Sequence, residues 1–417
     1  MTNVTRRELE ARDQADPLHR FRAEFELPEG VIYLDGNSLG ALPRRARERL
    51  RAVIENEWGR GLIRSWNDAH WIGMPRRTGD KIARLIGAGP GEVVAADSTS
   101  VNLFKALSVA VRARAGRRVV ISERANFPTD LHVVQGLATQ LGNVELVLAE
   151  PTNEGIEECL AQHGSNTAAV LLTHVHYTTS QIYDMPRVTH AAHEAGALMI
   201  WDLSHSAGVV PVGLGACDAD FAVGCGYKHL NGGPGAPAFI YVARRLQENY
   251  TQPISGWMGD ARPFEFRGEY VPAPGIDRYL SGTPPVIGMA ALEASVEVIL
   301  EAPMQEIRRK SIALGDLFVE LMRSRCGKHG FELVSPREGA MRGSHVSYRH
   351  EASYPIMQAL IAGGVIGDCR PPDLVRFGFA PLYNRFVDIW DAVDRIEGVC
   401  ASGAWRSFHD RPRGAVI

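Results

Sequence analysis

The sequence predicts an α/β protein whose main domain is built on a mostly parallel β-sheet. From residue 74 onward, helical and strand patterns alternate with a period of about 20 to 30 residues, which is typical of βαβ units. Several predicted strands are short continuous apolar runs, such as 168–172 and 197–201. Runs of this kind are typical of strands that are buried on both faces of a parallel sheet.

Length and composition predict two domains. The chain has 417 residues, of which 45% are hydrophobic and 22% are charged, so it can bury a large core. We expect an N-terminal arm over residues 1–45 that packs with a small domain. A large domain would cover residues 46–290, and the smaller α+β domain would cover residues 291–417.

Charge and cysteine spacing argue against several classes of protein. A net charge of −3 gives no reason to expect a nucleic-acid partner, and two short arginine-rich stretches, 44–49 and 112–118, fit solvated helix faces or ends. None of the six cysteines has C-x-x-C spacing, and the first residues lack an apolar signal core. No apolar run approaches the length of a membrane span. We therefore expect a cytoplasmic protein without a membrane partner.

The N-terminal third begins with a short strand over 31–34 and a turn rich in glycine and asparagine over 35–40. This turn could present backbone groups to a ligand, and a plain turn explains it equally well. A helix over 43–57 should be opened by Pro43. The irregular segment that follows carries Trp58, Trp66 and Trp71, which would either belong to the core or line an aromatic substrate pocket.

The next βα unit contains a candidate phosphate site. A strand over 92–96 is followed by a helix that opens at 97–102 and runs to about residue 114. Thr99 and Ser100 stand at the start of this helix, where hydroxyl groups satisfy free backbone amides and where phosphate binds well. A simple helix cap is the alternative.

Two further strands end in polar residues. After the strand over 118–122, Phe127 could stack on a flat ring, and Asp130 could cap the next helix or support the ring's substituents. The strand over 168–172 leads to Thr173 and then to His174 and His176. The two histidines resemble half of a metal site, but no third ligand has a suitable spacing, so we expect no metal.

The central stretch, residues 201–228, carries the most specific signal. One buried strand, 197–201, delivers Asp202 and His205, and a second, 220–225, delivers Tyr227 and Lys228. Both pairs follow the carboxyl end of a strand, where open α/β sheets bind ligands. Pyridoxal phosphate needs a lysine amine for its Schiff base and a carboxylate beside its pyridine nitrogen. Asp202 alone would be a turn residue and Lys228 alone a solvated one, but together they indicate this cofactor.

The C-terminal part begins after a strand over 238–242. Residues 251–285 are dense in proline and glycine and predict a long loop, which is typically functional or interfacial. Helices over 286–301 and 303–325 lead to strands near 331–335 and 344–349 and to helices near 353–363 and 386–399. Arg376 lies in an apolar strand and needs an anion there. A substrate carboxylate and a structural ion pair are equally good candidates.

Five motifs together resemble the kynureninase family. They are Tyr-Leu-Asp-Gly-Asn-Ser-Leu-Gly at 33–40, Asn-Phe-Pro-Thr-Asp at 126–130, Trp-Asp-Leu-Ser-His-Ser-Ala-Gly at 201–208, Gly-Tyr-Lys at 226–228 and Arg-Phe-Gly at 376–378. The resemblance runs from about residue 20 to the C-terminus. Other members of the same superfamily share the aspartate, histidine and lysine, but neither the first motif nor a tyrosine directly before the lysine.

This resemblance implies a fold, a reaction and an assembly. The fold would be PLP-dependent transferase fold type I, which is aspartate-aminotransferase-like, with a mostly parallel seven-stranded sheet in the large domain. The reaction would be the hydrolysis of L-kynurenine to anthranilate and L-alanine in tryptophan degradation, carried out by a homodimer. The residues leave open whether 3-hydroxy-L-kynurenine is also cleaved and whether the product enters NAD biosynthesis or a secondary metabolite.

The resemblance also implies roles for individual residues. Lys228 would bind the cofactor, Asp202 would pair with its pyridine nitrogen, and Tyr227 would bind the phosphate. From its place beside Lys228 and the phosphate, we add the hypothesis that Tyr227 relays a proton. The residues expected to bind the cofactor are Thr99, Ser100, Phe127, Pro128, Thr129, Asp130, Thr173, Asp202, His205, Tyr227, Lys228 and, from the partner subunit, Trp257 and Thr283. Thr283 departs from the family, because eukaryotic members have asparagine there. Arg376 would bind the substrate carboxylate, and Trp66 would face its aryl ring.

Two other functions remain as alternatives. A cysteine desulfurase or selenocysteine lyase would use Cys369 as a nucleophile on a loop shortly before Arg376. The short spacing and the neighbouring Arg-Pro-Pro sequence make a mobile loop there difficult. A non-catalytic binding protein on the same fold is the second alternative, and the intact set of Asp202, His205 and Lys228 argues against it.

Overall fold

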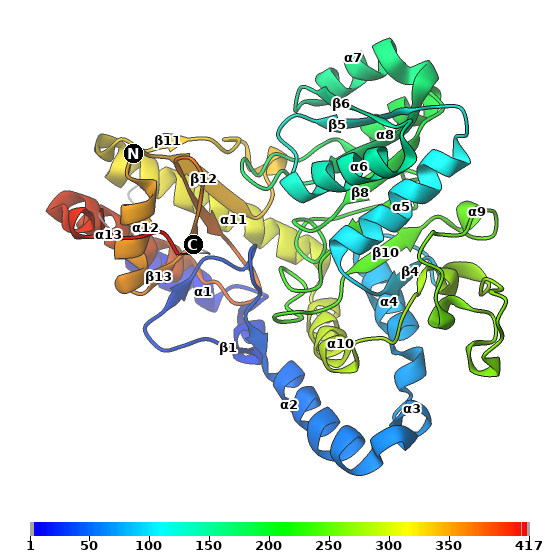
Figure 1. Ribbon diagram of the computed structural model, residues 1–417. Coiled ribbons are helices and arrows are strands. Elements are labelled where there is room, and N and C mark those ends of the chain that lie inside the picture. Colours follow the sequence, from blue (N-terminus) through cyan, green and yellow to red (C-terminus); the bar gives the residue numbers. More distant parts are fainter. Residues whose placement is uncertain (1–3, 410, 415–417) are drawn as a thin grey trace.

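The computed structural model describes residues 4–409 and 411–414. Figure 1 shows two bodies, each built around its own sheet. The larger sheet has seven strands in the order β4-β10-β9-β8-β7-β5-β6, and the smaller has four in the order β11-β12-β15-β14. The predicted fold class, an α/β protein with a mostly parallel seven-stranded sheet and a smaller C-terminal α+β unit, is confirmed.

The large sheet is parallel except at one strand. Its members are β4 (Val93–Ala95), β5 (Val119–Glu123), β6 (Glu145–Ala149), β7 (Thr167–Thr173), β8 (Leu198–Asp202), β9 (Phe221–Gly224) and β10 (Phe239–Val242). Strands β6, β5, β7, β8 and β9 run parallel, and β10 is antiparallel to both β9 and β4. Strand β6 had not been predicted; it is the partly exposed edge strand, so its apolar signal is weak.

Helices cover the large sheet and connect its strands. They are α4 (Met74–Leu85), α5 (Thr99–Ala113), α6 (Pro128–Leu141), α7 (Asn153–His163), α8 (Met185–Glu194), α9 (Arg244–Gln247) and α10 (Val286–Leu300). Helix α5 packs beside α6, and α7 packs beside α8. The side chain of Ser98 accepts a hydrogen bond from the Val101 amide and caps α5. The capping residue therefore precedes the predicted phosphate-binding hydroxyls.

The small sheet is antiparallel and packs with three long helices. Its strands are β11 (Glu332–Leu333), β12 (His345–Arg349), β14 (Asp368–Arg370) and β15 (Leu374–Gly378), and the helices are α11 (Met304–Leu321), α12 (Ser353–Ala362) and α13 (Phe386–Ser402). The N-terminal segment joins this body, because α1 (Arg6–Gln14) packs on α13 and β2 (Ile32–Tyr33) pairs with β13 (Val365–Ile366). The exact domain boundaries stay a prediction.

The segment between the two bodies differs from the prediction in detail. Strand β1 (Phe25–Glu26) pairs with β3 (Leu42–Pro43), and α2 (Arg44–Ala52) follows directly. Pro43 is the residue before the helix, and the helix continues past residue 57 as a wider turn over Val53–Gly61. Together with α3 (Ser65–Asp68), this segment projects from the rest of the molecule in Figure 1.

The predicted long loop over 251–285 contains only short 3-10 turns, Trp257–Gly259, Pro263–Glu265 and Gly275–Tyr279. Within the described residues, no helix has the length and apolar character needed to cross a membrane.

Candidate active site

The candidate site lies at one edge of the large sheet. Asp202 is the last residue of β8, Thr173 is the last residue of β7, and Lys228 follows β9. Because these strands are parallel, their carboxyl ends meet at the same edge, and the register places Thr173 directly beside Asp202. Phe127, which directly precedes α6, and Asp130, in the first turn of that helix, follow β5 at this same edge.

The side chain of Lys228 is surrounded by other predicted site residues at this edge of the sheet. Its Nζ lies 3.0 Å from Nε2 of His205. The ring centroid of Phe127 lies 5.8 Å from Nζ, and that of Tyr227 lies 6.0 Å from it. The amide of Gly40 donates to the Tyr227 carbonyl at 2.8 Å, so the first family motif packs onto the lysine segment. A side chain at Gly40 would collide with the Lys228 carbonyl, since its Cβ would stand 2.4 Å from that oxygen.

Two buried carboxyl groups face the lysine. Asp202 accepts a hydrogen bond from the Ser204 amide at 2.7 Å, and Asp130 accepts one from the Thr173 hydroxyl at 3.4 Å. Burial raises the pKa of Asp130 well above its usual range, and nearby Asp202 raises it further. Burial also raises the pKa of Asp202, while Ser204 and Lys228 oppose that change. Because burial disfavours the ionised form of both carboxyl groups, a positively charged group placed beside them would stabilise that form.

The donor set fits pyridoxal phosphate. The amine of Lys228 suits its aldehyde, the carboxyl of Asp202 suits a protonated ring nitrogen, and Phe127 offers an aromatic face. The first turn of α5, with Thr99 and Ser100, offers backbone amides to the phosphate. Nδ1 of His205 is buried without a hydrogen-bond partner in the described part of the chain, so the site has polar capacity that its own residues leave unused.

Arg376 lies on β15, and each of its three guanidinium nitrogens donates to a protein group. Its Nε donates to Oδ1 of Asp368 at 2.9 Å and its Nη2 to Oδ2 at 2.5 Å. Nη2 also donates to the hydroxyl of Ser38 at 2.8 Å, and Nη1 donates to the carbonyl of Tyr177 at 2.6 Å. With its amide oriented to satisfy both ends, Asn37 accepts from Nε at 3.1 Å and from Nη2 at 3.2 Å. The structural ion pair, one of two expectations, is therefore present.

Sequence reasoning missed the residues that hold Arg376. Asp368 faces it directly on the neighbouring strand β14, and Ser38 and Asn37 reach it from the turn after β2. The motif at 33–40 was recognised, but its contact with a strand more than 300 residues later is a tertiary fact without a local signal. The charged Asp368, set in an apolar region, was the available hint.

Cys369 does not have the setting of a nucleophile. It lies inside strand β14 rather than on a loop, and its Sγ donates to the Ser353 carbonyl at 3.4 Å. Burial raises the pKa of its thiol to about 12, so the group stays protonated at neutral pH. This placement argues against the desulfurase alternative.

Three predicted site residues lie elsewhere in the single chain. Trp257 forms an exposed aromatic cluster with Phe264 and Phe266 at ring distances of 5.6 and 6.4 Å. Thr283 is exposed as well. Trp66 packs edge-on against Trp71 at 5.8 Å, in the segment that projects from the molecule. Their contacts with cofactor or substrate stay predictions.

The paired histidines His174 and His176 have local partners. Nε2 of His176 bonds with the Ala125 carbonyl at 2.8 Å, and its Nδ1 accepts from the Thr178 amide at 3.3 Å. His174 packs edge-on against Trp201 at 5.8 Å. In the part of the chain that the structure describes, no group of three or more His, Cys, Asp or Glu side chains could hold a metal ion.

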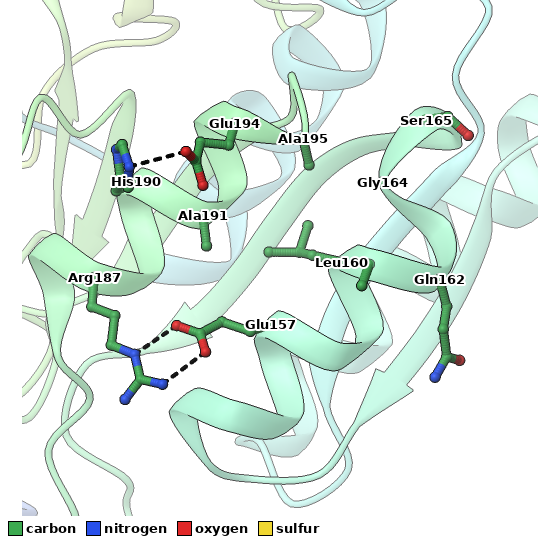
Figure 2. A pocket seen from close by; sticks show the side chains of 11 residues that line it. Glu157, Leu160, Gln162, Gly164, Ser165, Arg187, His190, Ala191, Glu194 and Ala195 are labelled. Atoms are coloured by element: carbon green, nitrogen blue, oxygen red, sulfur yellow. Dashed lines mark hydrogen bonds and ion pairs between the residues drawn. The ribbon is translucent and has the colours of Figure 1, made fainter.

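A surface hollow of about 760 Å³ lies between α7 and α8 (Figure 2), and Lys228 is not among the residues that line it. Its polar side chains already contact one another: Arg187 pairs with Glu157 at 2.6 Å, and His190 lies 3.3 Å from Glu194. These side chains already have protein partners, so the hollow does not compete with the strand-end site.

Known proteins resemble this chain over its whole length. The family model described as the kynureninase C-terminal domain matches residues 307–396. A protein named kynureninase from Burkholderia pseudomallei is 51% identical over 417 residues, covering 99% of each chain. Another, from Pseudomonas fluorescens, is 49% identical and covers 99% of this chain and 100% of the relative.

Solved structures support the fold alone. The apo structure of a cysteine desulfurase from Thermococcus onnurineus matches with a TM-score of 0.78 at 20% identity, covering 92% of this chain and 98% of that one. A C-DES variant with glycine covalently linked to its PLP cofactor matches with a TM-score of 0.79 at 16% identity, covering 90% of this chain and 98% of that one. At these identities the likeness carries no information about substrate.

Proposed function

The chain belongs to the kynureninase family, and we infer from this membership that it hydrolyses the Cβ–Cγ bond of L-kynurenine, releasing anthranilate and L-alanine. The observation that carries this conclusion is 51% identity over 99% of both chains. The enzyme depends on pyridoxal 5'-phosphate. Its reaction belongs to tryptophan degradation.

We propose that Lys228 holds this cofactor, with Asp202 at the ring nitrogen and Phe127 against the ring face. His205 and Asp130, with its partner Thr173, support the ring on the side of the lysine. Thr99, Ser100 and Tyr227 bind the phosphate, and Pro128 and Thr129, at the start of α6, complete the cofactor site. When bound, the cofactor supplies an electron-accepting ring that stabilises negative charge at the substrate's α-carbon.

The proton steps fall to two neighbouring residues. The amine of Lys228 takes the α-proton, because its nitrogen stands at the junction of Asp202, Phe127 and His205. Tyr227 relays a proton beside it, and burial raises the pKa of this phenol, which keeps the hydroxyl protonated and able to donate. Arg376 binds the substrate carboxylate through Nη1, the nitrogen that faces away from Asp368, which carries a second hydrogen besides the one donated to the Tyr177 carbonyl.

We propose a homodimer in which Trp257 and Thr283 of the partner subunit complete each site. Two observations support it. Trp257 is 37% exposed and Phe266 is 77% exposed, and an exposed apolar cluster of this kind is typical of a protein–protein interface. An apolar groove of about 430 Å³ lies directly beside Thr283, and it is lined by Val53, Trp58, Trp71, Pro284, Pro285, Val286, Ile287 and Gly288. Trp66 lies next to this groove through its contact with Trp71 and faces the aryl ring of the substrate in the assembled dimer.

A cytoplasmic location is part of this proposal. All six cysteines are free thiols in the structure, which suits a reducing compartment. The kynurenine pathway also supplies precursors for NAD biosynthesis, and we propose that the products of this enzyme can enter it.

The reaction is tested by mixing the cofactor-loaded protein with L-kynurenine and following anthranilate by its fluorescence. We expect anthranilate to form with the wild type and not with Lys228→Ala. If the wild type shows the absorbance band of the bound cofactor but forms no anthranilate, kynurenine is refuted as the substrate. A parallel assay with 3-hydroxy-L-kynurenine measures substrate preference. A second assay with cysteine, scored by sulfide release, tests the desulfurase alternative.

A further inference from the structure

Three buried imidazoles gather behind the lysine, and they come from both bodies of the molecule. His205 and His229 belong to the large body and His345 begins strand β12 of the small one. Their exposed fractions are 3%, 6% and 0%. The rings of His205 and His345 have centroids 5.5 Å apart and are tilted by 55°. His229 directly follows Lys228 in the chain.

Four nitrogen atoms of these rings lack a partner among the described residues. They are Nδ1 of His205, Nε2 of His229 and both nitrogens of His345. A buried donor or acceptor left unpaired destabilises the folded state, and such groups are rare in folded proteins. His205 and His345 make no hydrogen bond with each other, although their rings are neighbours. The cluster is therefore built to hold a bridging molecule.

The charges around the cluster define that molecule. The groups that face His345 are Arg376, His229, His176 and Lys228, with the ring of His205 against it. Burial lowers the pKa of all three imidazoles, and the two cations lower it further, to about 3 for His229. The rings are therefore neutral, each with one donor and one acceptor. Lys228 and Arg376 repel a cation. The three rings are neutral and Arg376 is already paired with Asp368, so the cluster has little free positive charge to hold an anion. The unpaired ring nitrogens therefore suit a small neutral molecule that both donates and accepts hydrogen bonds, namely water.

We propose that His205, His229 and His345 bind buried water that links the Lys228–His205 pair to the small body, and that His345 is a positioning residue for the lysine. The proposal rests on the proposed role of Lys228 as the base. When Lys228 is an ammonium group, Nε2 of His205 must accept a hydrogen bond from it, so the ring's own proton sits on Nδ1 and needs an acceptor. Water held by His345 is that acceptor. No bond is formed or broken, and the chain of hydrogen bonds fixes the tautomer of His205.

The first test is structural. Crystals of the cofactor-free and the cofactor-loaded protein, at a resolution that shows ordered solvent, should contain a water within about 3.2 Å of Nδ1 of His205 and of one nitrogen of His345. The same water should persist in both forms, because the residues that hold it belong to the protein. A space without ordered solvent in both crystals, or a direct bond between the two rings, would overturn the proposal.

The second test measures the tautomer. In ¹⁵N-histidine NMR of the cofactor-free protein, His205 should carry its proton on Nδ1 in the wild type and in His345→Gln, which keeps a side chain that hydrogen-bonds. His345→Leu should lose this preference. The matched control is His350→Leu, because both nitrogens of His350 are bonded within the small body, at 2.9 Å each. An unchanged tautomer in His345→Leu would refute the link.

Kinetics separate this inference from the proposed function. His345→Leu should lower kcat for kynurenine about tenfold while KM changes little, and His345→Gln should recover most of kcat. Equal kcat in His345→Leu and the wild type would refute a positioning role. If the wild type failed to cleave kynurenine, the proposed function would fall, whereas the water and the tautomer would still be decided by the crystals and the NMR spectra.

Discussion

Asp368 and Arg376 lie directly opposite each other on neighbouring strands and form a two-point ion pair, Nε to Oδ1 at 2.9 Å and Nη2 to Oδ2 at 2.5 Å. Both side chains are nearly fully buried. Arg370 shares the same carboxylate at 2.6 Å. The guanidinium that we assign to the substrate carboxylate is thus held in place by a carboxylate of the protein.

Replacing Asp368 should therefore weaken substrate binding. Asp368→Asn keeps the shape but removes the charge that orients Arg376, and a charge-assisted hydrogen bond is worth about 1.5 to 3 kcal/mol. We expect KM for kynurenine to rise about tenfold or more with a smaller change in kcat. Steady-state kinetics measure this. The control is Asp373→Asn, whose half-exposed pair with Arg349 lies on the same sheet at 3.3 Å. An unchanged KM in Asp368→Asn would contradict the role of this pair.

The part of the site on the large sheet could be predicted from the sequence. Thr173, Asp202 and Lys228 each follow a buried apolar strand, and parallel strands place such residues at one edge. The family motifs then supplied their roles. The surroundings of Arg376 and His345 could not be predicted, because they depend on how the small sheet docks against the large one. Local patterns carry no information about that contact, so Asp368, Ser38 and the histidine cluster emerged only from the structure.

Asp35 should make stability depend on pH. Burial and the nearby Asp368 raise its pKa to about 7, against the opposing effect of Arg376, Arg370 and Ser38. A carboxyl group whose folded pKa is raised stabilises the folded state below its unfolded pKa, near 3.8, and loses that contribution as the pH rises to about 7. The shift corresponds to about 4 kcal/mol.

The substitution Asp35→Asn removes this titration. The melting temperature of the variant, relative to the wild type, should therefore be higher at pH 8 than at pH 5. Thermal unfolding at both values, with equal buffer concentrations and the cofactor-free protein, provides the measurement. A difference between variant and wild type that is the same at pH 5 and pH 8 would show that Asp35 does not titrate in this range.

Tyr227→Phe should lower kcat and leave cofactor binding in place. The ring centroid of Tyr227 lies 6.0 Å from Nζ of Lys228 and its phenol is the proton donor in our proposal, and a positioned acid contributes about 10²-fold or more to a proton transfer. The absorbance of the bound cofactor reports binding independently of turnover, and KM should change only a few-fold. Full activity in Tyr227→Phe would remove this residue from the proton relay. Loss of the cofactor's absorbance band in Tyr227→Phe would instead indicate that Tyr227 acts in binding the phosphate alone.

Cys369→Ser should retain kynurenine cleavage within about twofold. The thiol is protonated at neutral pH and bonds to a backbone carbonyl inside a strand, so it has no nucleophilic role. Serine can make the same hydrogen bond and occupies a similar volume. Anthranilate fluorescence measures the activity, and a sulfide assay with cysteine should give no signal above background for either protein. Loss of cleavage in a folded Cys369→Ser protein would reopen the question of its role.

Hybrid dimers should show whether Trp257 acts in the partner's site. Lys228→Ala and Trp257→Ala each disable both sites of their own homodimer. If Trp257 of the partner subunit completes each site, a hybrid of the two variants has one site with both an intact lysine and an intact tryptophan. Random mixing at equal amounts then restores about one quarter of wild-type activity, since half of the dimers are hybrids and half of their sites are intact. If Trp257 acts within its own chain, each hybrid site carries one of the two defects, and mixing after dissociation and reassembly restores nothing.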